Sequence, residues 1–300
     1  MIDSTGKRVM NMWIILAFAS ALFAGITAIL AKVGVKKTDS MLATAIRTII
    51  ILIFSWLMVL VAGSWTSIYA IDTKSLIFLI LSGLATGASW LCYFKALQLG
   101  NVNKVTPIDK FSTVLTMIFA FIILGESITL AKFAGMTAIG IGTYMMIDIK
   151  KTQQQKTTGT GYAWFIYAVL SAVFASLTAI LAKIGITGVE SNLGTAIRTV
   201  VVLIMAWLMV FITRKQGDIK KIDLKSWIFL CLSGITTGLS WLCYFKALQD
   251  GEASIVVPID KLSIVITVAF SYFILKEKLT LKTFLGLIFI VAGTMTLLLP

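Results

Sequence analysis

The chain contains no histidine, and this absence removes imidazole from every metal site or catalytic arrangement that it could form. Its three cysteines lie inside apolar stretches without a CxxC pair, so we interpret Cys92, Cys231 and Cys243 as small buried hydrophobic residues. The sequence also has no Gly-x-Ser-x-Gly motif. It therefore predicts no cofactor and no metal, and it argues against an enzyme.

Charged residues are scarce as well. They make up 13% of the chain, where soluble proteins carry about a quarter, and the mean hydropathy is +0.98. The net charge of +13 does not indicate nucleic-acid binding, because Lys and Arg are scattered between apolar runs and form no basic patch. The composition thus predicts a protein embedded in a lipid bilayer, with no nucleic-acid partner.

Ten apolar stretches are long enough to cross a hydrocarbon core, which takes about 20 residues of helix. In the first half they cover about 12–34, 40–62, 75–98, 104–124 and 130–149. In the second half they cover about 162–185, 191–213, 225–248, 254–275 and 280–299. A polar linker over 150–161 separates the halves. The expected fold is an all-α membrane protein with ten transmembrane helices.

The two halves repeat one another. A shift of 151 residues places TAILAKVG from Thr27 on TAILAKIG from Thr178, and SWLCYFKALQ from Ser89 on an identical stretch from Ser240. Because each unit has an odd number of spans, the chain enters the second unit from the opposite side of the membrane. This predicts two inverted five-helix repeats, over 1–149 and 162–300, a design common in secondary transporters.

Two further motifs recur near the ends of the fourth span of each unit. PIDK opens it at Pro107 and Pro258, and LGE or LKE closes it at Glu126 and Glu277. With the two five-span units, these motifs resemble the EamA family of the drug/metabolite transporter superfamily over nearly the whole chain. SWLCYFKALQ and PIDK are similar to those of short bacterial five-span members, here fused in tandem. The resemblance implies transport of a small metabolite across the inner (cytoplasmic) membrane of a prokaryote.

The orientation in the membrane has two alternatives. Four basic residues flank the spans on the side of the N-terminus, and fourteen flank them on the other side. By the positive-inside rule this count favours both termini outside. The family resemblance instead implies both termini in the cytoplasm, and Lys7 and Arg8 before the first span keep that alternative open.

Ionisable side chains inside the spans are costly unless they face protein or water, so they are candidates for function. Each unit carries the same five. They are Lys32, Arg47, Lys95, Asp109 and Lys110 in the first unit, and Lys183, Arg198, Lys246, Asp260 and Lys261 in the second. Chain direction places the first set at one face of the membrane and the inverted second set at the other. The alternative for Lys32, Lys95, Lys183 and Lys246 is snorkelling to the interface.

These two sets suggest a pair of gates. We expect Asp109 to pair with Arg47, Lys32 or Lys95 when its face is shut, and Asp260 to pair with Arg198, Lys183 or Lys246 at the other face. Glu126 and Glu277 lie at the opposite ends of the same spans. Each set counts four cations against one Asp, and this excess favours anionic or zwitterionic solutes.

Polar and aromatic residues near mid-span are candidates for lining the solute pathway. Ser112 and Ser263 share a helix face with Asp109 and Asp260, respectively. The other candidates lie on the third span of each unit and are Ser89, Trp90, Tyr93, Ser240, Trp241 and Tyr244. Core packing is the alternative for the aromatic side chains.

The function predicted is secondary transport of a small anionic or zwitterionic, amino-acid-like metabolite by alternating access, as an exporter or exchanger. A flippase or scramblase of lipid headgroups is the first alternative, and a membrane-embedded enzyme is a weaker one. The protein would act as a monomer or homodimer. The substrate, the direction and the coupling ion stay open.

Overall fold

The computed structural model describes residues 4–34, 38–99, 105, 108–146, 162–273 and 280–299. Over these residues the chain is helical and has no strand. The first half forms α1 (Ser4–Gly34), α2 (Ser40–Val61), η1 (Ser64–Ala70), α3 (Thr73–Leu99), α5 (Ser112–Ile123) and α6 (Leu130–Met145). The second half forms α7 (Ala163–Ile186), α8 (Ser191–Ile212), η3 (Gln216–Lys221), α9 (Leu224–Asp250), α10 (Ala253–Lys261), α11 (Ser263–Phe273) and α12 (Leu281–Thr296). The predicted all-α class is confirmed.

Seven helices of the described residues are long and apolar enough to cross a membrane. They are α1, α2, α3, α7, α8, α9 and the joined segment Ala253–Phe270. The helices α5, α6 and α12 have 12, 16 and 16 residues, which is short for a membrane span. The span predicted over 254–275 is not one continuous helix, because the chain breaks at Leu262 between α10 and α11.

Equivalent positions begin helices in both halves. Asp39 accepts a hydrogen bond from the amide of Met41 at the start of α2, and Glu190 does the same for Leu193 at the start of α8. Asp72 accepts from the amide of Ser75 at the start of α3, and hydrogen bonds from Ser75 lower the pKa of this carboxyl. Asp223 starts α9, and Thr129 and Thr280 start α6 and α12, in the same way. Each cap satisfies an amide that has no partner within its helix.

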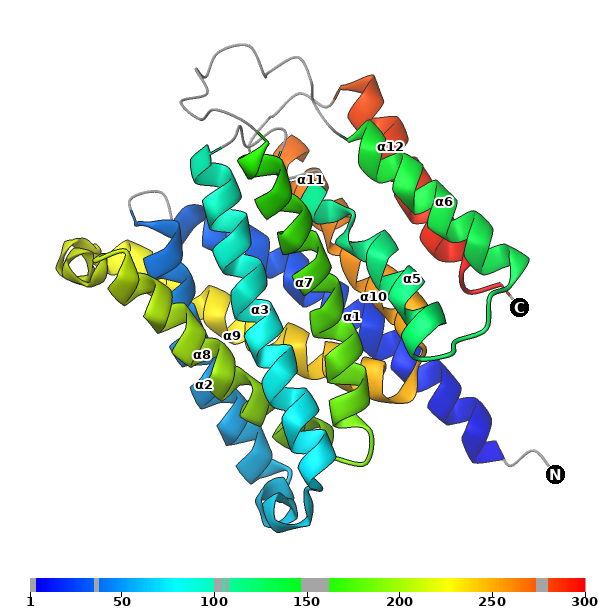
Figure 1. The fold of residues 1–300 in the computed structure, drawn as a ribbon, viewed down its shortest axis with the longest axis horizontal. Coiled ribbons are helices and arrows are strands. Elements are labelled where there is room, and N and C mark those ends of the chain that lie inside the picture. The colour runs from blue at the N-terminus through cyan, green and yellow to red at the C-terminus, as the bar shows by residue number, and fades with distance from the viewer. Residues whose placement is uncertain are drawn as a thin grey trace.

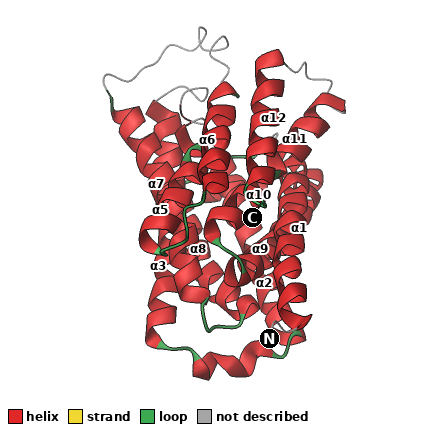
Figure 2. Cartoon of the chain, turned by 90° about the vertical axis from the view of Figure 1, so that its right-hand side faces the viewer, coloured by secondary structure: helices red, strands yellow, loops and turns green. Residues whose placement is uncertain are grey.

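The helices pack mainly across the two halves of the chain. α1 lies along α9, α3 along α7, α2 along α8, and α6 along α12. In Figure 1 the members of the pairs α1–α9, α3–α7 and α6–α12 run in opposite directions. Figure 2 shows the same bundle turned by 90°, with α6 and α12 next to each other in the upper part of the view. No half forms a bundle of its own, so the interior of the protein is the contact between the halves.

Glycines allow the closest of these approaches. A Cβ atom on Gly142 of α6 would lie 2.5 Å from the carbonyl oxygen of Gly286, and one on Gly135 would lie 2.7 Å from that of Gly293. In α3, a Cβ on Gly83 would lie 2.7 Å from a side-chain atom of Val201 in α8. Backbone contact of this kind supplies the dispersion energy that holds helices together where lipid surrounds them.

Candidate functional site

Two helix breaks mark the middle of the bundle, directly after the repeated Asp-Lys pairs. The amide of Phe111 donates to the carbonyl of Ile108 at 3.1 Å, and that of Leu262 donates to Ile259 at 3.0 Å. Both are bonds to the third preceding residue, so the helix tightens there before α5 and α11 begin. Irregular backbone inside a membrane protein is tolerated where protein or a cavity surrounds it. The breaks therefore point to a cavity.

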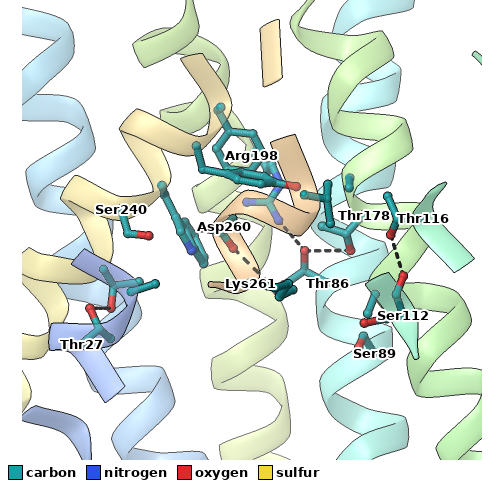
Figure 3. A pocket seen from close by; sticks show the side chains of 18 of the residues that line it. Thr27, Thr86, Ser89, Ser112, Thr116, Thr178, Arg198, Ser240, Asp260 and Lys261 are labelled. Atoms are coloured by element: carbon teal, nitrogen blue, oxygen red, sulfur yellow. Dashed lines mark hydrogen bonds and ion pairs between the residues drawn. The ribbon is translucent and has the colours of Figure 1, made fainter. Parts of the chain in front are cut away.

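A cavity of about 400 Å³ lies at this place, between the two halves. Its wall includes both Arg47 and Arg198, together with Asp260 and Lys261 from the end of α10. Six of the predicted pathway residues also line it, namely Ser89, Trp90, Ser112, Ser240, Trp241 and Tyr244. Figure 3 shows Arg198, Asp260 and Lys261 gathered around this space, with the hydroxyls of Thr86 and Thr178 nearby.

Two predicted pathway residues lie elsewhere. Tyr93 packs in a small apolar cluster with Ala96 and Val105, and its ring contacts Phe94 edge-on at 5.9 Å. Ser263 lines a second cavity beside the first. Neither residue is part of the wall of the central cavity.

Arg198 is the most enclosed of the charged side chains, with 2% of its surface exposed. Its Nε donates to Ser82 Oγ at 2.9 Å and one terminal nitrogen donates to Thr86 Oγ1 at 2.5 Å. The guanidinium also lies 5.1 Å from the ring of Trp241 and 4.6 Å from that of Phe245. Hydroxyls and aromatic faces solvate the charge without neutralising it. Arg198 thus keeps a net positive charge at the cavity wall.

Arg47 repeats this arrangement in part. It donates to Thr237 Oγ1 at 2.7 Å, and Thr237 is the equivalent of Thr86 after the shift of 151 residues. Its Nε has no hydrogen-bond partner among the described residues. Each arginine therefore reaches from the second span of one half to the third span of the other half.

The two aspartates bind serines of the opposite half. Ser171 Oγ donates to Asp109 Oδ1 at 2.8 Å, and Ser20 Oγ donates to Asp260 Oδ1 at 2.6 Å. Asp260 also lies 3.9 Å from the ammonium of its neighbour Lys261. Asp260 does not pair with Arg198, Lys183 or Lys246 in this structure, and Ser20 and Lys261 are its partners instead. The ion pairs expected when a face is shut stay a prediction.

The predicted separation of the two charged sets differs from the structure. Arg47 and Arg198 line one cavity and do not lie at opposite faces. The cause is the packing of α2 along both α8 and α9, which brings each arginine into the contact between the halves. Both arginines stand well inside their helices, so chain direction alone did not fix the depth of their side chains.

The four lysines near span ends lie in different surroundings and contact different groups. Lys183 Nζ donates to the carbonyls of Leu248, Gln249 and Gly251, at 2.6, 3.0 and 2.8 Å, and so caps the end of α9. Lys246 pairs with Asp250 at 3.1 Å. Lys95 lines a small separate pocket with Cys92 and Phe94, and Lys32 lies in the last turn of α1. Lys183 is therefore neither snorkelling nor paired with an aspartate.

Glu126 also has a structural partner in the other half. Its two carboxylate oxygens accept from the amides of Ala253 and Ser254 at 2.6 and 2.9 Å, where α10 begins. A carboxylate at this position satisfies free amides and complements the helix dipole. The equivalent Glu277 lies outside the described residues.

Next to this cap, Lys132 of α6 binds Glu252 at the turn before α10. The Lys132 side chain is 7% exposed and also donates to the carbonyl of Ser127 at 2.9 Å. The shift of 151 residues places the uncharged Thr283 and Asn101 at the equivalent positions, so the other unit does not repeat the charges of this pair. The sequence analysis did not identify this pair. The signal that could have found it is the presence of charged residues at two positions where the other unit has uncharged ones.

We predict that Lys132→Met lowers the free energy of unfolding by about 1–2 kcal/mol, because hydrogen bonds to a buried ammonium are lost. Water can replace part of this interaction, since the Glu252 side chain is 44% exposed. The measurement is the thermal unfolding midpoint of the purified protein. Lys221→Met is the matched control, because Lys221 is 78% exposed in its pair with Asp218 and its loss should leave the unfolding midpoint nearly unchanged. Equal shifts of the unfolding midpoint in the two variants would show that the buried pair stabilises the protein no more than the exposed pair does.

Apolar helices long enough to cross a membrane, two repeated units packed on each other and a polar cavity between them are features expected of a membrane transport protein. The profile of the EamA-like transporter family matches residues 11–148 and again 162–299. The chain therefore belongs to the EamA-like transporter family, with one family unit in each half. The resemblance seen in the sequence is confirmed.

Two relatives match parts of the chain. An uncharacterised transporter in the cobO 3′ region of a Sinorhizobium species is 46% identical over 135 residues, which cover 45% of this chain and 96% of that protein. An uncharacterised protein of Methanocaldococcus jannaschii is 36% identical over 90 residues, covering 30% of this chain and 66% of that protein. The Sinorhizobium protein is thus about one unit long, as expected for an unfused relative.

The fold of one solved crystal structure resembles the fold of nearly the whole chain. It superposes with a TM-score of 0.75 at 16% identity, covering 96% of both chains. At this identity the likeness concerns the fold alone.

Proposed function

We propose that this protein is a secondary transporter of a small anionic or zwitterionic metabolite, working by alternating access as an exporter or exchanger. It would span the inner membrane of a prokaryote ten times, as two inverted five-helix units over 1–149 and 162–300 joined by the linker 150–161. The observation that carries the proposal is the cavity between the halves, lined by Arg47 and Arg198.

The packing supports the inverted arrangement. If the halves exchange roles, α1 along α9 becomes α7 along α3, and α2 along α8 maps onto itself; all three contacts are present. The contacts of the aspartates follow the same exchange, since Ser20 and Ser171 are 151 residues apart, as are Asp109 and Asp260. A bundle with this symmetry has two equivalent ways to open, one toward each side of the membrane.

The electrostatics of the cavity support the solute class. Its wall holds three cations and one carboxylate, and both guanidinium groups are solvated by hydroxyls instead of by acidic residues. A carboxylate or phosphate group can accept from a guanidinium through two parallel hydrogen bonds. Trp90, Trp241 and Tyr244 add apolar surface beside these donors, which suits a solute with an organic body.

The test is a thermal-shift screen of the purified protein against amino acids, organic acids, phosphorylated metabolites, nucleosides and lipophilic cations. A ligand that binds the native state raises the unfolding midpoint, so we expect shifts from carboxylates or phosphates and none from the cations. Uptake of the hits into proteoliposomes, with and without a pH gradient, then distinguishes proton coupling from exchange. Shifts from lipophilic cations alone, or lipid scrambling without solute uptake, would refute the proposal.

A further inference from the structure

A second cavity of about 430 Å³ lies beside the central one. The two share Ala24 and Lys261 in their walls, so Lys261 stands between them. The second cavity extends toward the pair α6 and α12, which contribute Thr143 and Ile290. It is polar as well as apolar, because Thr113, Ser263 and Thr267 also line it.

Two lysines of the repeated PIDK motif meet at this second cavity. Lys110 from the first half and Lys261 from the second half are equivalent residues, and both line it. Among the described residues, no hydrogen bond or ion pair holds the ammonium of Lys110, although the charges of Lys261, Asp109 and Asp260 act on it electrostatically. The ammonium of Lys261 lies 3.9 Å from the carboxylate of Asp260. Two like charges from opposite halves thus face one space, without a hydrogen bond holding either ammonium.

The charges around the joined cavities do not balance. Counting each residue once, the walls contain four cations, Arg47, Arg198, Lys110 and Lys261, and one carboxylate, Asp260. Asp109, the neighbour of Lys110, adds a second carboxylate, which is bound to Ser171. Two positive charges remain, in a bundle whose apolar surroundings make each uncompensated charge costly.

We propose that the transported solute is a dianion that occupies both cavities at once. One anionic group is bound by Arg47 and Arg198 in the central cavity, and the second is bound by Lys110 and Lys261 in the adjoining one. The chemical class is a small organic acid with two anionic groups, either a dicarboxylate or a phosphorylated acid. This inference rests on the proposed function and specifies the charge of its solute.

The experiment compares matched probes on the purified full-length protein. Succinate is paired with succinamate, and 3-phosphoglycerate with glycerate, so that each pair differs by the loss of one anionic group. Dissociation constants come from the dependence of the unfolding midpoint on ligand concentration. For at least one pair, we expect the more highly charged probe to bind about tenfold tighter or more, as for an added close charge pair.

Variants locate the second anionic group. In the double variant Lys110→Met/Lys261→Met, the preference for the more charged probe should disappear, so that the two probes of each pair bind with dissociation constants within about twofold of each other. In Lys110→Arg/Lys261→Arg the preference should remain, which shows that charge is what matters if the Met variant is unstable. Lys220→Met/Lys225→Met is the control, since it removes the same charge from exposed positions and should leave both constants unchanged.

The outcomes separate the two proposals. If succinamate binds as tightly as succinate and glycerate binds as tightly as 3-phosphoglycerate, the solute with two anionic groups is wrong and the anion or zwitterion transporter stands. The same holds if the preference survives in Lys110→Met/Lys261→Met. If no carboxylate or phosphate probe binds at all, both proposals fail. A preference that is lost only on changing Lys110 and Lys261 supports the dianion.

Discussion

Replacing Arg198 with methionine is expected to reduce solute uptake at least about thirtyfold, which corresponds to about 2 kcal/mol. Methionine keeps much of the side-chain length, but it removes the positive charge from the cavity wall. Ser82 and Thr86 also lose the donor that orients their hydroxyls. The loss should appear in solute binding as well as in uptake, because the proposed role of Arg198 is to hold the solute.

Two further variants make this prediction specific. Arg198→Lys keeps the charge but cannot reach Ser82 and Thr86 together while presenting a planar group to Trp241, so we expect intermediate uptake. Arg214→Met removes an arginine from an exposed turn and should transport normally. The measurement is uptake into proteoliposomes at equal protein content, together with the unfolding midpoint. Full uptake by Arg198→Met would remove the central cavity from the solute pathway.

The second large effect is expected at the contact of α6 with α12. In Gly142→Ala, the new methyl group would lie 2.5 Å from the carbonyl oxygen of Gly286 and 2.9 Å from the amide of Ile290. Both are backbone atoms and cannot rotate away as a side chain could. The helices must separate, so we expect a loss of stability of about 1–3 kcal/mol or more.

The same helix provides the control for this prediction. A Cβ on Gly140 would meet only Val114, at 3.7 Å, which is ordinary van der Waals contact. Gly140→Ala should therefore be neutral or slightly stabilising, because alanine favours helix over glycine. Unfolding midpoints of the two variants measure the difference. If both variants unfold at the same temperature, α6 and α12 do not pack as closely as described.

Much of the fold follows from features that depend on residues close to one another in the sequence. The helix caps at Asp39, Asp72 and Thr129 are formed with amides two or three residues further along the chain, and their equivalents recur 151 residues later. The repeat also identifies which charged residues belong together. These features depend on neighbours along the chain, so a one-dimensional pattern contains them.

The partners of the charged residues could not be predicted in this way. The sequence suggested that carboxylates would neutralise the cations, but Arg198 binds two hydroxyls and Lys183 binds three backbone carbonyls. Hydroxyls and carbonyls are present on nearly every turn, so composition does not reveal which of them is near a given cation. Only the packing of α8 on α3, and of α7 on α9, determines these contacts.

The Lys132–Glu252 pair has no charged equivalent in the other unit. For the proposed transporter, this difference affects the apparent affinity for solute on each side of the membrane. Because the equivalent positions hold the uncharged Thr283 and Asn101, the two conformations that the proposed alternating access requires would differ in free energy before any solute arrives. The rarer conformation is available only for a fraction of the time, and apparent affinity falls by that fraction. The same solute should then half-saturate the protein at different concentrations when offered from the two sides.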